Sequence, residues 1–345
     1  MTALLEHVDP DGLLEFSVVF TDRSLNHMSA SFKEVMTDVS CILKQVYGAD
    51  AVAIIPGGGT FGMEAVARQF GRDAKVLVVR NGWFSYRWSQ IFDACGSASD
   101  VQVIKARQTG NDKQAAFCPA PIEEVVAQIR SSKPDVVFAP HVETSAGLIL
   151  PDDYIIALAA AAHEVGALMV LDCIASGCAW VAMRATGVDV LISAPQKGWS
   201  ASPCAGLVML SERAVARLET STSDSFAIDL KKWHGIMQIY ENGGQAYHAT
   251  MPTDALRTFR DTMLETHYYG FARLCAAQWE LGDAVRAMLN AKGVRSVAAD
   301  GFGAPGVVVS YTTDDPAIQN GSKFSTQGMQ IAAGVPLQCD EPEGF

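Results

Sequence analysis

Short apolar runs alternate with amphipathic stretches over the first two thirds of the chain. Seven runs consist mainly of Val, Ile, Leu and Ala, which is typical of strands buried on both faces. They are Ala51–Ile55, Lys75–Arg80, Val101–Lys105, Asp135–Ala139, Ala167–Leu171, Asp189–Ser193 and Gly206–Leu210. Helical periodicity marks Ser29–Val46, Phe61–Phe70, Ile122–Ser131 and Asp152–Val165. This alternation predicts an α/β fold with a mainly parallel seven-stranded sheet flanked by helices.

The pattern changes after about residue 255. Two helical stretches, a strand and a shorter helix are predicted there, at Asp254–Ala277, Leu281–Lys292, Gly306–Tyr311 and Gln327–Ala333. They predict a smaller C-terminal α+β domain. We therefore divide the chain into an N-terminal segment (1–19), a large domain (20–254) and a small C-terminal domain (255–345).

Composition narrows the class of protein. Hydrophobic residues make up 49% of the 345 residues, and 26 Lys and Arg against 38 Asp and Glu give a net charge of −12. These values exclude a disordered chain and argue against a nucleic-acid binder, whose affinity rests on neutralising phosphates. Met1–Leu14 has no basic start, and His163 interrupts the most apolar segment. We expect a cytoplasmic protein that binds neither nucleic acid nor membrane.

A glycine-rich segment, Pro56–Gly62, lies between a predicted strand and a predicted helix. Its backbone N–H groups at a helix start form an anion site. The spacing of Gly57, Gly59 and Gly62 also fits the dinucleotide fingerprint, which requires an acid about 20 residues on. The next strand ends with Val79–Asn81 instead, and its arginine could suit a 2′-phosphate. An NADP-dependent dehydrogenase therefore stays an alternative.

An acid and a lysine each follow a predicted strand. Asp172 lies at the carboxyl end of one strand and Lys197 lies just past the next, at the edge where open α/β sheets bind ligands. Taken singly, Asp172 could cap the next element and Lys197 could be a solvated surface residue. A desolvated lysine can instead form a Schiff base. With the glycine segment, the two residues supply what pyridoxal phosphate requires.

Three more segments complete a pattern that resembles a known family. They are Asn81–Phe84, His141–Gly147 and Tyr247–Pro252. Together with the segments around Gly58, Asp172 and Lys197, they resemble the class V aminotransferase family of fold-type I pyridoxal-phosphate enzymes, in its alanine–glyoxylate and serine–glyoxylate branch. The resemblance extends from about Asn26 to the end of the chain. It implies a fold-type I PLP-transferase that uses pyridoxal 5'-phosphate.

The resemblance also implies roles for the matching residues. Lys197 would form the Schiff base, and Asp172 would pair with the pyridine nitrogen. The other implied cofactor contacts are Gly58, Gly59, Thr60 and Gln196 at the phosphate, Phe84 and Ile174 on the two ring faces, and Thr144 and Ser145 near the ring hydroxyl and the substrate. Tyr247 and Thr250 match residues that reach the partner subunit's phosphate in the family, so a homodimer is implied.

The implied reaction moves an amino group from a small amino acid, of the alanine or serine type, to a small 2-oxo acid, of the glyoxylate or pyruvate type. The family holds the substrate carboxylate with an arginine of a C-terminal strand, but no arginine follows Arg295 here. We expect that arginine beyond the end of this chain, with the small domain incomplete; the alternatives are that another arginine takes its place or that the substrate is bound differently. The family's N-terminal Gly-Pro stretch is replaced by Phe20–Ser24.

Other readings of the same residues stay open. A cysteine desulfurase or lyase of the same class would need a mobile cysteine, for which Cys173, Cys178 and Cys204 are candidates, but Gln196 stands where desulfurases have a histidine before the lysine. Buried structural thiols are the commoner explanation for such cysteines. A catalytically idle cofactor-binding relative is a further alternative. The spacing of His and Cys residues predicts no metal site.

Overall fold

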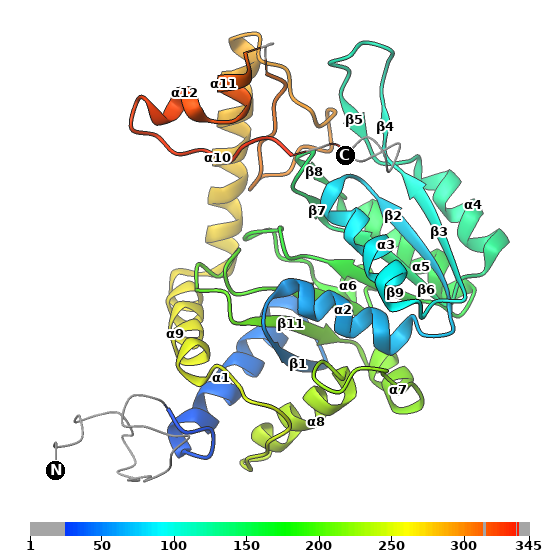
Figure 1. The fold of residues 1–345 in the computed structure, drawn as a ribbon, viewed down its shortest axis with the longest axis vertical. Helices are drawn as coiled ribbons and strands as arrows, with labels where there is room; N and C mark the ends of the chain where they lie inside the picture. Colours follow the sequence, from blue (N-terminus) through cyan, green and yellow to red (C-terminus); the bar gives the residue numbers. More distant parts are fainter. Residues whose placement is uncertain (1–24, 313–314, 336, 338–345) are drawn as a thin grey trace.

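A twisted seven-stranded sheet organises the part of the chain that the computed structural model describes, which is residues 25–312, 315–335 and 337 (Figure 1). The strands are β1 (Ala51–Pro56), β2 (Lys75–Arg80), β3 (Asp100–Lys105), β6 (Val136–Pro140), β9 (Leu168–Asp172), β10 (Val190–Ser193) and β11 (Ala205–Leu210). Their order is β1-β11-β10-β9-β6-β2-β3, and β11 alone runs in the direction opposite to the other six strands of this sheet. The predicted seven-stranded, mainly parallel sheet is confirmed to within two residues at each strand end.

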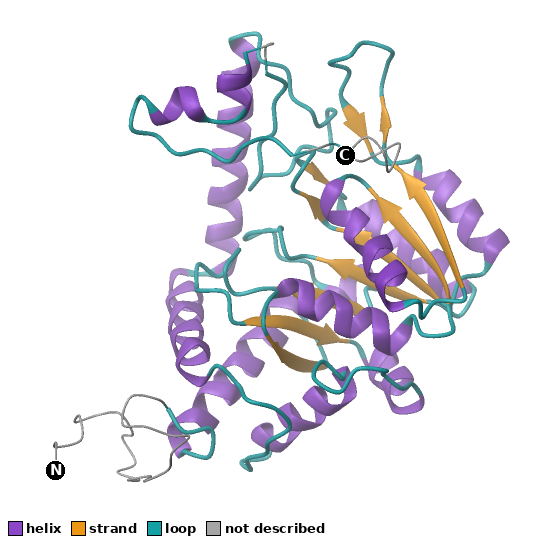
Figure 2. Ribbon diagram, viewed as in Figure 1, coloured by secondary structure: helices purple, strands orange, loops and turns teal. Residues whose placement is uncertain are grey.

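Helices cover both faces of this sheet (Figure 2). They are α1 (Ala30–Tyr47), α2 (Gly59–Phe70), α3 (Trp83–Cys95), α4 (Ile122–Ser132), α5 (Asp152–Glu164), α6 (Met183–Thr186), α7 (Glu212–Thr220) and α8 (Leu230–Glu241). Two short hairpins pair β4 (Arg107–Gln108) with β5 (Phe117–Cys118) and β7 (Val142–Glu143) with β8 (Leu148–Ile149). Every residue of β6, β9, β10 and β11 is buried, which explains why these strands are continuously apolar in the sequence.

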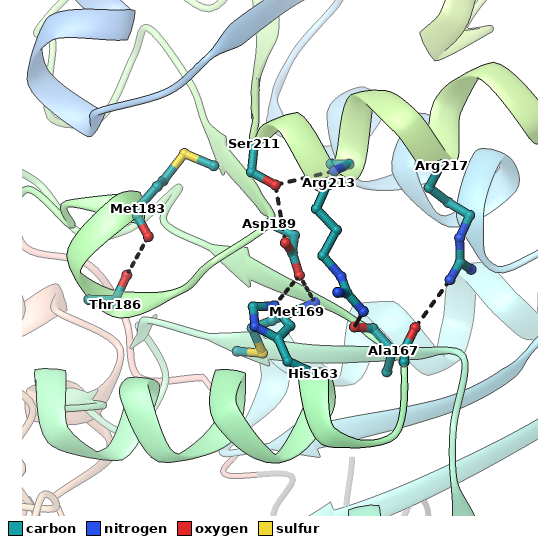
Figure 3. Close-up of polar contacts among 11 residues, drawn as sticks. His163, Ala167, Met169, Met183, Thr186, Asp189, Ser211, Arg213 and Arg217 are labelled. Atoms are coloured by element: carbon teal, nitrogen blue, oxygen red, sulfur yellow. Dashed lines mark hydrogen bonds and ion pairs between the residues drawn. The ribbon is translucent and has the colours of Figure 1, made fainter.

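The sheet has an amino edge, where its parallel strands begin, and a carboxyl edge, where they end. At the amino edge, the buried carboxylate of Asp189 accepts hydrogen bonds from the Nε2 of His163 (2.8 Å), the N–H of Met169 (2.9 Å) and the Oγ of Ser211 (3.1 Å) (Figure 3). Two arginines of α7 donate to carbonyls of the turn between α5 and β9, Arg213 to Ala167 and Arg217 to Gly166. These bonds tie α5, β9, β10 and α7 together and leave the carboxyl edge for the site.

The C-terminal third differs from its prediction in three places. The helices are α9 (Thr253–Tyr269), α10 (Phe271–Ala291), α11 (Pro316–Gln319) and α12 (Ser322–Ser325), and the break between the first two falls at Gly270, whose φ is +105°, rather than after Ala277. The strand predicted at 306–311 is wrong, because within the described residues this segment makes only an isolated bridge, Ser296 to Ser310, and a strand requires a continuous partner. The helix predicted at 327–333 is also wrong, since Gly328 has a φ of +74°.

Several predictions fall on residues outside the described part of the chain. The N-terminal segment 1–19, the stretch Phe20–Ser24 and the last residues of the small domain are among them. The division of the chain near residue 254 stays a prediction. Of the helices that the structure describes, none has both the length and the apolar character needed to cross a membrane.

Candidate functional site

The glycine segment forms the turn from β1 into α2. The helix begins at Gly59, with Gly58 as an N-cap that contributes no side chain. A Cβ on Gly59 would lie 2.6 Å from the Cδ1 of Ile174 and 3.3 Å from the Cβ of Ala194, so glycine allows the helix start to approach the segments after β9 and β10. A Cβ on Gly58 would meet no atom within 4 Å, so space lies in front of the backbone there. The helix dipole and these first amides favour an anion.

Asp172 is the last residue of β9 and lies buried at the carboxyl edge of the sheet. Its Oδ1 accepts a hydrogen bond from the N–H of Ile174 at 2.9 Å. Burial raises the pKa of Asp172 to about 7, against the opposing effect of the Ile174 N–H. The charge of Glu143 adds to the rise, while Arg87 and Lys197 oppose it. A cationic group bound beside this carboxyl would therefore hold it in the charged form.

Lys197 lies on the loop that follows β10. The loop is anchored by the buried indole of Trp199, which packs against Trp180 with ring centroids 5.0 Å apart. The Lys197 side chain itself is exposed in this single chain, so the sequence-based expectation of a desolvated lysine is not met here. A Cβ on the adjacent Gly198 would lie only 2.1 Å from the carbonyl oxygen of Gly177, so the two loops touch through their backbones.

The segment before α3 is held by a buried carboxylate. Glu143 Oε1 accepts from the N–H of Phe84 (3.1 Å) and from the N–H and Oγ of Ser145 (3.1 and 2.7 Å). Its Oε2 accepts from the N–H and Oγ of Ser85 (2.9 and 2.6 Å). The Ser145 hydroxyl also accepts from the N–H of Trp83 at 2.9 Å. A negative charge at this helix start satisfies N–H groups that have no partner inside the helix.

Arg87 connects this segment to the glycine turn. Its Nη1 donates to the Oγ1 of Thr60 at 3.2 Å, and its guanidinium lies 5.5 Å from the ring centroid of Phe84. The positive charge of Arg87 also stabilises the charged form of Asp172. Although the chain is acidic overall, it therefore has a local positive charge beside the anion site predicted at the glycine segment.

The structure brings most of the predicted site residues to one edge of the sheet, as these contacts show for Gly58, Gly59, Thr60, Phe84, Ser145, Asp172, Ile174 and Lys197. Thr144 lies half-buried next to Ser145 on the turn after β7. Tyr247 and Thr250 lie elsewhere, on the exposed loop between α8 and α9. Their side-chain oxygens are 3.3 Å apart, and Tyr247 also packs on the ring of His27.

Sequence reasoning missed three residues of this site. Glu143 stands inside a quoted segment and Arg87 just beyond one, but their partners are 58 and 27 residues away, so no local pattern identifies them. His141 is the third: its Nδ1 lies 2.7 Å from the Oγ of Ser176, and its backbone N–H donates to the carbonyl of Asp172. Burial lowers the pKa of His141 to about 4, so its imidazole is neutral at pH 7.

The expected cofactor fits the residues that are present. The half-buried Gln196 has a buried Oε1 with no hydrogen-bond partner among the described residues, but this oxygen is an acceptor and cannot bond to a phosphate oxygen, so the fit rests on the glycine turn and Arg87. Gly58 leaves room in front of the helix start, and Arg87 adds a cation there. Together these suit a phosphate group. The described residues contain no cluster of His, Cys, Asp and Glu able to hold a metal ion.

Comparison with known proteins identifies relatives along most of the chain. The 2-aminoethylphosphonate–pyruvate transaminase of Burkholderia mallei (strain SAVP1) is 30% identical over 314 residues, which cover 86% of this chain and 77% of the relative. Alanine–glyoxylate aminotransferase 1 of Saccharomyces cerevisiae is 25% identical over 331 residues, covering 90% of this chain and 82% of the relative. A solved alanine–glyoxylate aminotransferase from Nostoc sp. matches with a TM-score of 0.75 at 21% identity, over 90% of this chain and 81% of that structure. No family model matches the chain.

Proposed function

The chain belongs to the class V pyridoxal-phosphate aminotransferases, and on that premise we propose that it moves an amino group from a small amino acid of the alanine or serine type to a small 2-oxo acid of the glyoxylate or pyruvate type. One observation carries the proposal. The glycine turn before α2, the acid at the end of β9 and the lysine after β10 lie along one edge of the sheet, and Gly59 packs directly on Ile174 and Ala194 of the other two segments.

Pyridoxal phosphate, when bound, supplies an aldehyde that captures amines and a ring that accepts the electron pair of a broken Cα–H bond. Lys197 would hold the aldehyde through its ε-amine, as a Schiff base. The free Lys197 amine would act as the general base toward the proton of the donor Cα and as the general acid that delivers this proton to the cofactor carbon. The exposure of Lys197 in the single chain leaves its Nζ accessible to a ligand.

Asp172 would pair with the ring nitrogen. Burial raises the pKa of Asp172 to about 7, so a cationic ring nitrogen is the partner that keeps this carboxylate charged. The amides of Gly58, Gly59 and Thr60, with the side chain of Gln196, would bind the phosphate.

The remaining side chains would orient the ring and the substrate. Phe84 and Ile174 would enclose the ring, and Thr144 and Ser145 would lie near its hydroxyl. Ser145 is well placed to hold a fixed orientation, because its N–H and Oγ are both bonded to Glu143.

A homodimer belongs to the same proposal. Tyr247 is 63% exposed, and its hydroxyl lies 3.3 Å from that of Thr250, so the two oxygens form a pair that faces outward. In a dimer they would reach the partner subunit's phosphate. The cytoplasmic location expected from the sequence is also part of this proposal.

The test begins with the visible absorption of the purified protein, before and after borohydride, followed by peptide mapping. We expect a band that borohydride removes, with reduced cofactor fixed on Lys197. Alanine, serine and 2-aminoethylphosphonate are then compared as donors with glyoxylate and pyruvate as acceptors. A fixed cofactor without turnover of any pair would refute the proposed reaction, and a cofactor fixed on another lysine would refute the assigned site.

A further inference from the structure

The long helix α10 contacts the site through one glutamine. Figure 1 shows this helix standing as a column beside the sheet, between α9 and the C-terminal segments. Gln278 lies in its first half, and its Oε1 accepts from the N–H of Cys178 at 2.9 Å while its Nε2 donates to the carbonyl of Ser176 at 3.2 Å. The two bonds have opposite polarity, so only one orientation of the amide satisfies both. The side chain therefore holds the loop 176–178 on both sides of Gly177.

This loop lies between the acid and the lysine. Toward Asp172, the Oγ of Ser176 is 2.7 Å from the Nδ1 of His141. The backbone N–H of His141 donates to the carbonyl of Asp172 at 2.8 Å. Toward the lysine, the carbonyl of Gly177 lies against Gly198, the neighbour of Lys197, so closely that a Cβ there would be 2.1 Å away. A displacement of the loop 176–178 therefore moves the segments that carry Asp172 and Lys197.

Packing around the glutamine is close on two sides. Gly177 has a φ of +60°, and a Cβ on it would lie 2.4 Å from the Oε1 of Gln278. A Cβ on Gly306, from the segment beyond α10, would lie 3.3 Å from the Cδ of the same side chain. The amide group is thus enclosed by backbone, which restricts its rotamers.

We propose that Gln278 is a positioning residue, which fixes the loop 176–178 and thereby the placement of Lys197 relative to Asp172. The inference rests on the proposed function for its kinetic consequence only. Its structural consequence concerns the bound cofactor, and it can be measured whether or not the donor has been identified.

Gln278→Met is the main variant, because methionine keeps the length and much of the volume of the side chain but makes neither hydrogen bond. Gln278→Glu keeps an acceptor for the N–H of Cys178 but sets a carboxylate oxygen against the carbonyl of Ser176. We expect kcat to fall between about 10- and 100-fold in both, with a smaller change in the KM of the donor, because a displaced lysine slows proton transfer more than binding. Glu280→Ala, on the exposed side of the same helix, is the matched control and should behave as wild type.

Two readouts separate positioning from general destabilisation. The pH midpoint of the visible absorption of the bound cofactor should shift in both Gln278 variants, because it depends on the surroundings of the lysine. The affinity of the apo protein for pyridoxal phosphate should weaken as well. If both Gln278 variants fold and show the wild-type pH midpoint, cofactor affinity and kcat, the proposal is wrong. An unchanged spectrum with reduced thermal stability would assign Gln278 a structural role and would overturn it too.

A second pair of variants covers the case in which Gln278→Met does not fold. Gly177→Ala places a methyl group against the Gln278 amide and should shift the same pH midpoint in the same direction. Gly177→Ala combined with Gln278→Ala should be no worse than Gly177→Ala alone, because the collision is gone. Additive effects in this pair would refute a shared contact. If the wild-type protein turns over no donor, the proposed reaction fails, while the cofactor readouts still decide the role of Gln278.

Discussion

Replacing the buried carboxylate of Glu143 tests how the site is held in place. This carboxylate accepts five hydrogen bonds, from the N–H of Phe84 and from the N–H and Oγ of both Ser85 and Ser145. In Glu143→Gln, the amide oxygen can still face Phe84 and Ser145. The –NH2 group must then face Ser85, whose hydroxyl can turn its proton to the carbonyl of Gly82 at 3.1 Å but whose oxygen already accepts from the N–H groups of Asn81 and Gly82. The N–H of Ser85 cannot turn and stays opposite another donor.

The expected loss in the free energy of unfolding follows from the number of hydrogen bonds that the Glu143 variants lose. A hydrogen bond to a charged group contributes about 1.5–3 kcal/mol, and a buried donor left without a partner costs a similar amount. Glu143→Gln loses the charge at the start of α3 and leaves one backbone N–H unpaired, so we expect unfolding to become easier by about 3 kcal/mol. Glu143→Ala leaves three backbone N–H groups without this acceptor and should cost about 5 kcal/mol.

Urea unfolding of the apo protein, followed by tryptophan fluorescence, measures this cost. Two of the six tryptophans, Trp83 and Trp88, lie on α3, so the emission includes a contribution from the affected helix. Glu164→Gln is the matched control, because that glutamate forms an exposed ion pair with Arg130 and its removal should leave the unfolding midpoint unchanged. A Glu143→Gln protein within about 0.5 kcal/mol of wild type, the range of ordinary surface changes, would refute the reasoning.

Three further predictions concern Asp172, the dimer, and Asp189 at the amino edge of the sheet. In the apo protein the pKa of Asp172 is about 7, against an ordinary 3.8, so between these pH values the folded chain binds a proton that the unfolded chain does not. The free energy of unfolding therefore falls as the pH rises from about 4 to about 7. Asp172→Asn should flatten this fall in urea titrations. If the site is shared, a 1:1 mixture of Lys197→Ala with a Tyr247→Ala/Thr250→Ala double variant should regain about one quarter of wild-type activity, because about half of the dimers are hybrids and each hybrid has one intact site of two; no recovery would contradict sharing. Asp189→Asn should destabilise the protein by about 1–3 kcal/mol without moving the cofactor absorption, because it lies at the opposite edge, and a moved absorption would contradict that separation.

The sheet could be predicted from sequence because its signal is local. Each strand is a short run of apolar residues, and in β9 and β10 every position is buried, so composition alone defines the element. The carboxyl ends of parallel strands meet at one edge, which places Asp172 near the loop of Lys197 without any knowledge of packing. The C-terminal strand failed for the converse reason. The segment 306–311 has strand composition but no continuous partner in the described chain, and composition does not report partners.

The groups that orient the site could not be predicted in the same way. Glu143 acts on residues 58 positions earlier, and Gln278 acts on a loop 100 residues earlier. Glutamine in a helix is ordinarily a solvated residue, and nothing in the neighbouring sequence distinguishes Gln278 from the exposed Gln238 of α8. Only the folded backbone shows that Gly177 and Gly306 leave a space that an amide fills.

The charge of the site differs from the net charge of the chain, because residues distant in sequence meet at the carboxyl edge of the sheet. A chain with a net charge of −12 would repel a phosphate-bearing cofactor over most of its surface. At the carboxyl edge of the sheet, however, positive potential comes from the start of α2, the guanidinium of Arg87 and the amine of Lys197. The two side chains also favour the charged form of the buried Asp172. A ligand that carries both a phosphate and a protonatable ring nitrogen complements both parts, since each of its charges meets the opposite one. The arrangement therefore selects for the two charges of the cofactor together, and a phosphate without the ring cation would leave Asp172 uncompensated.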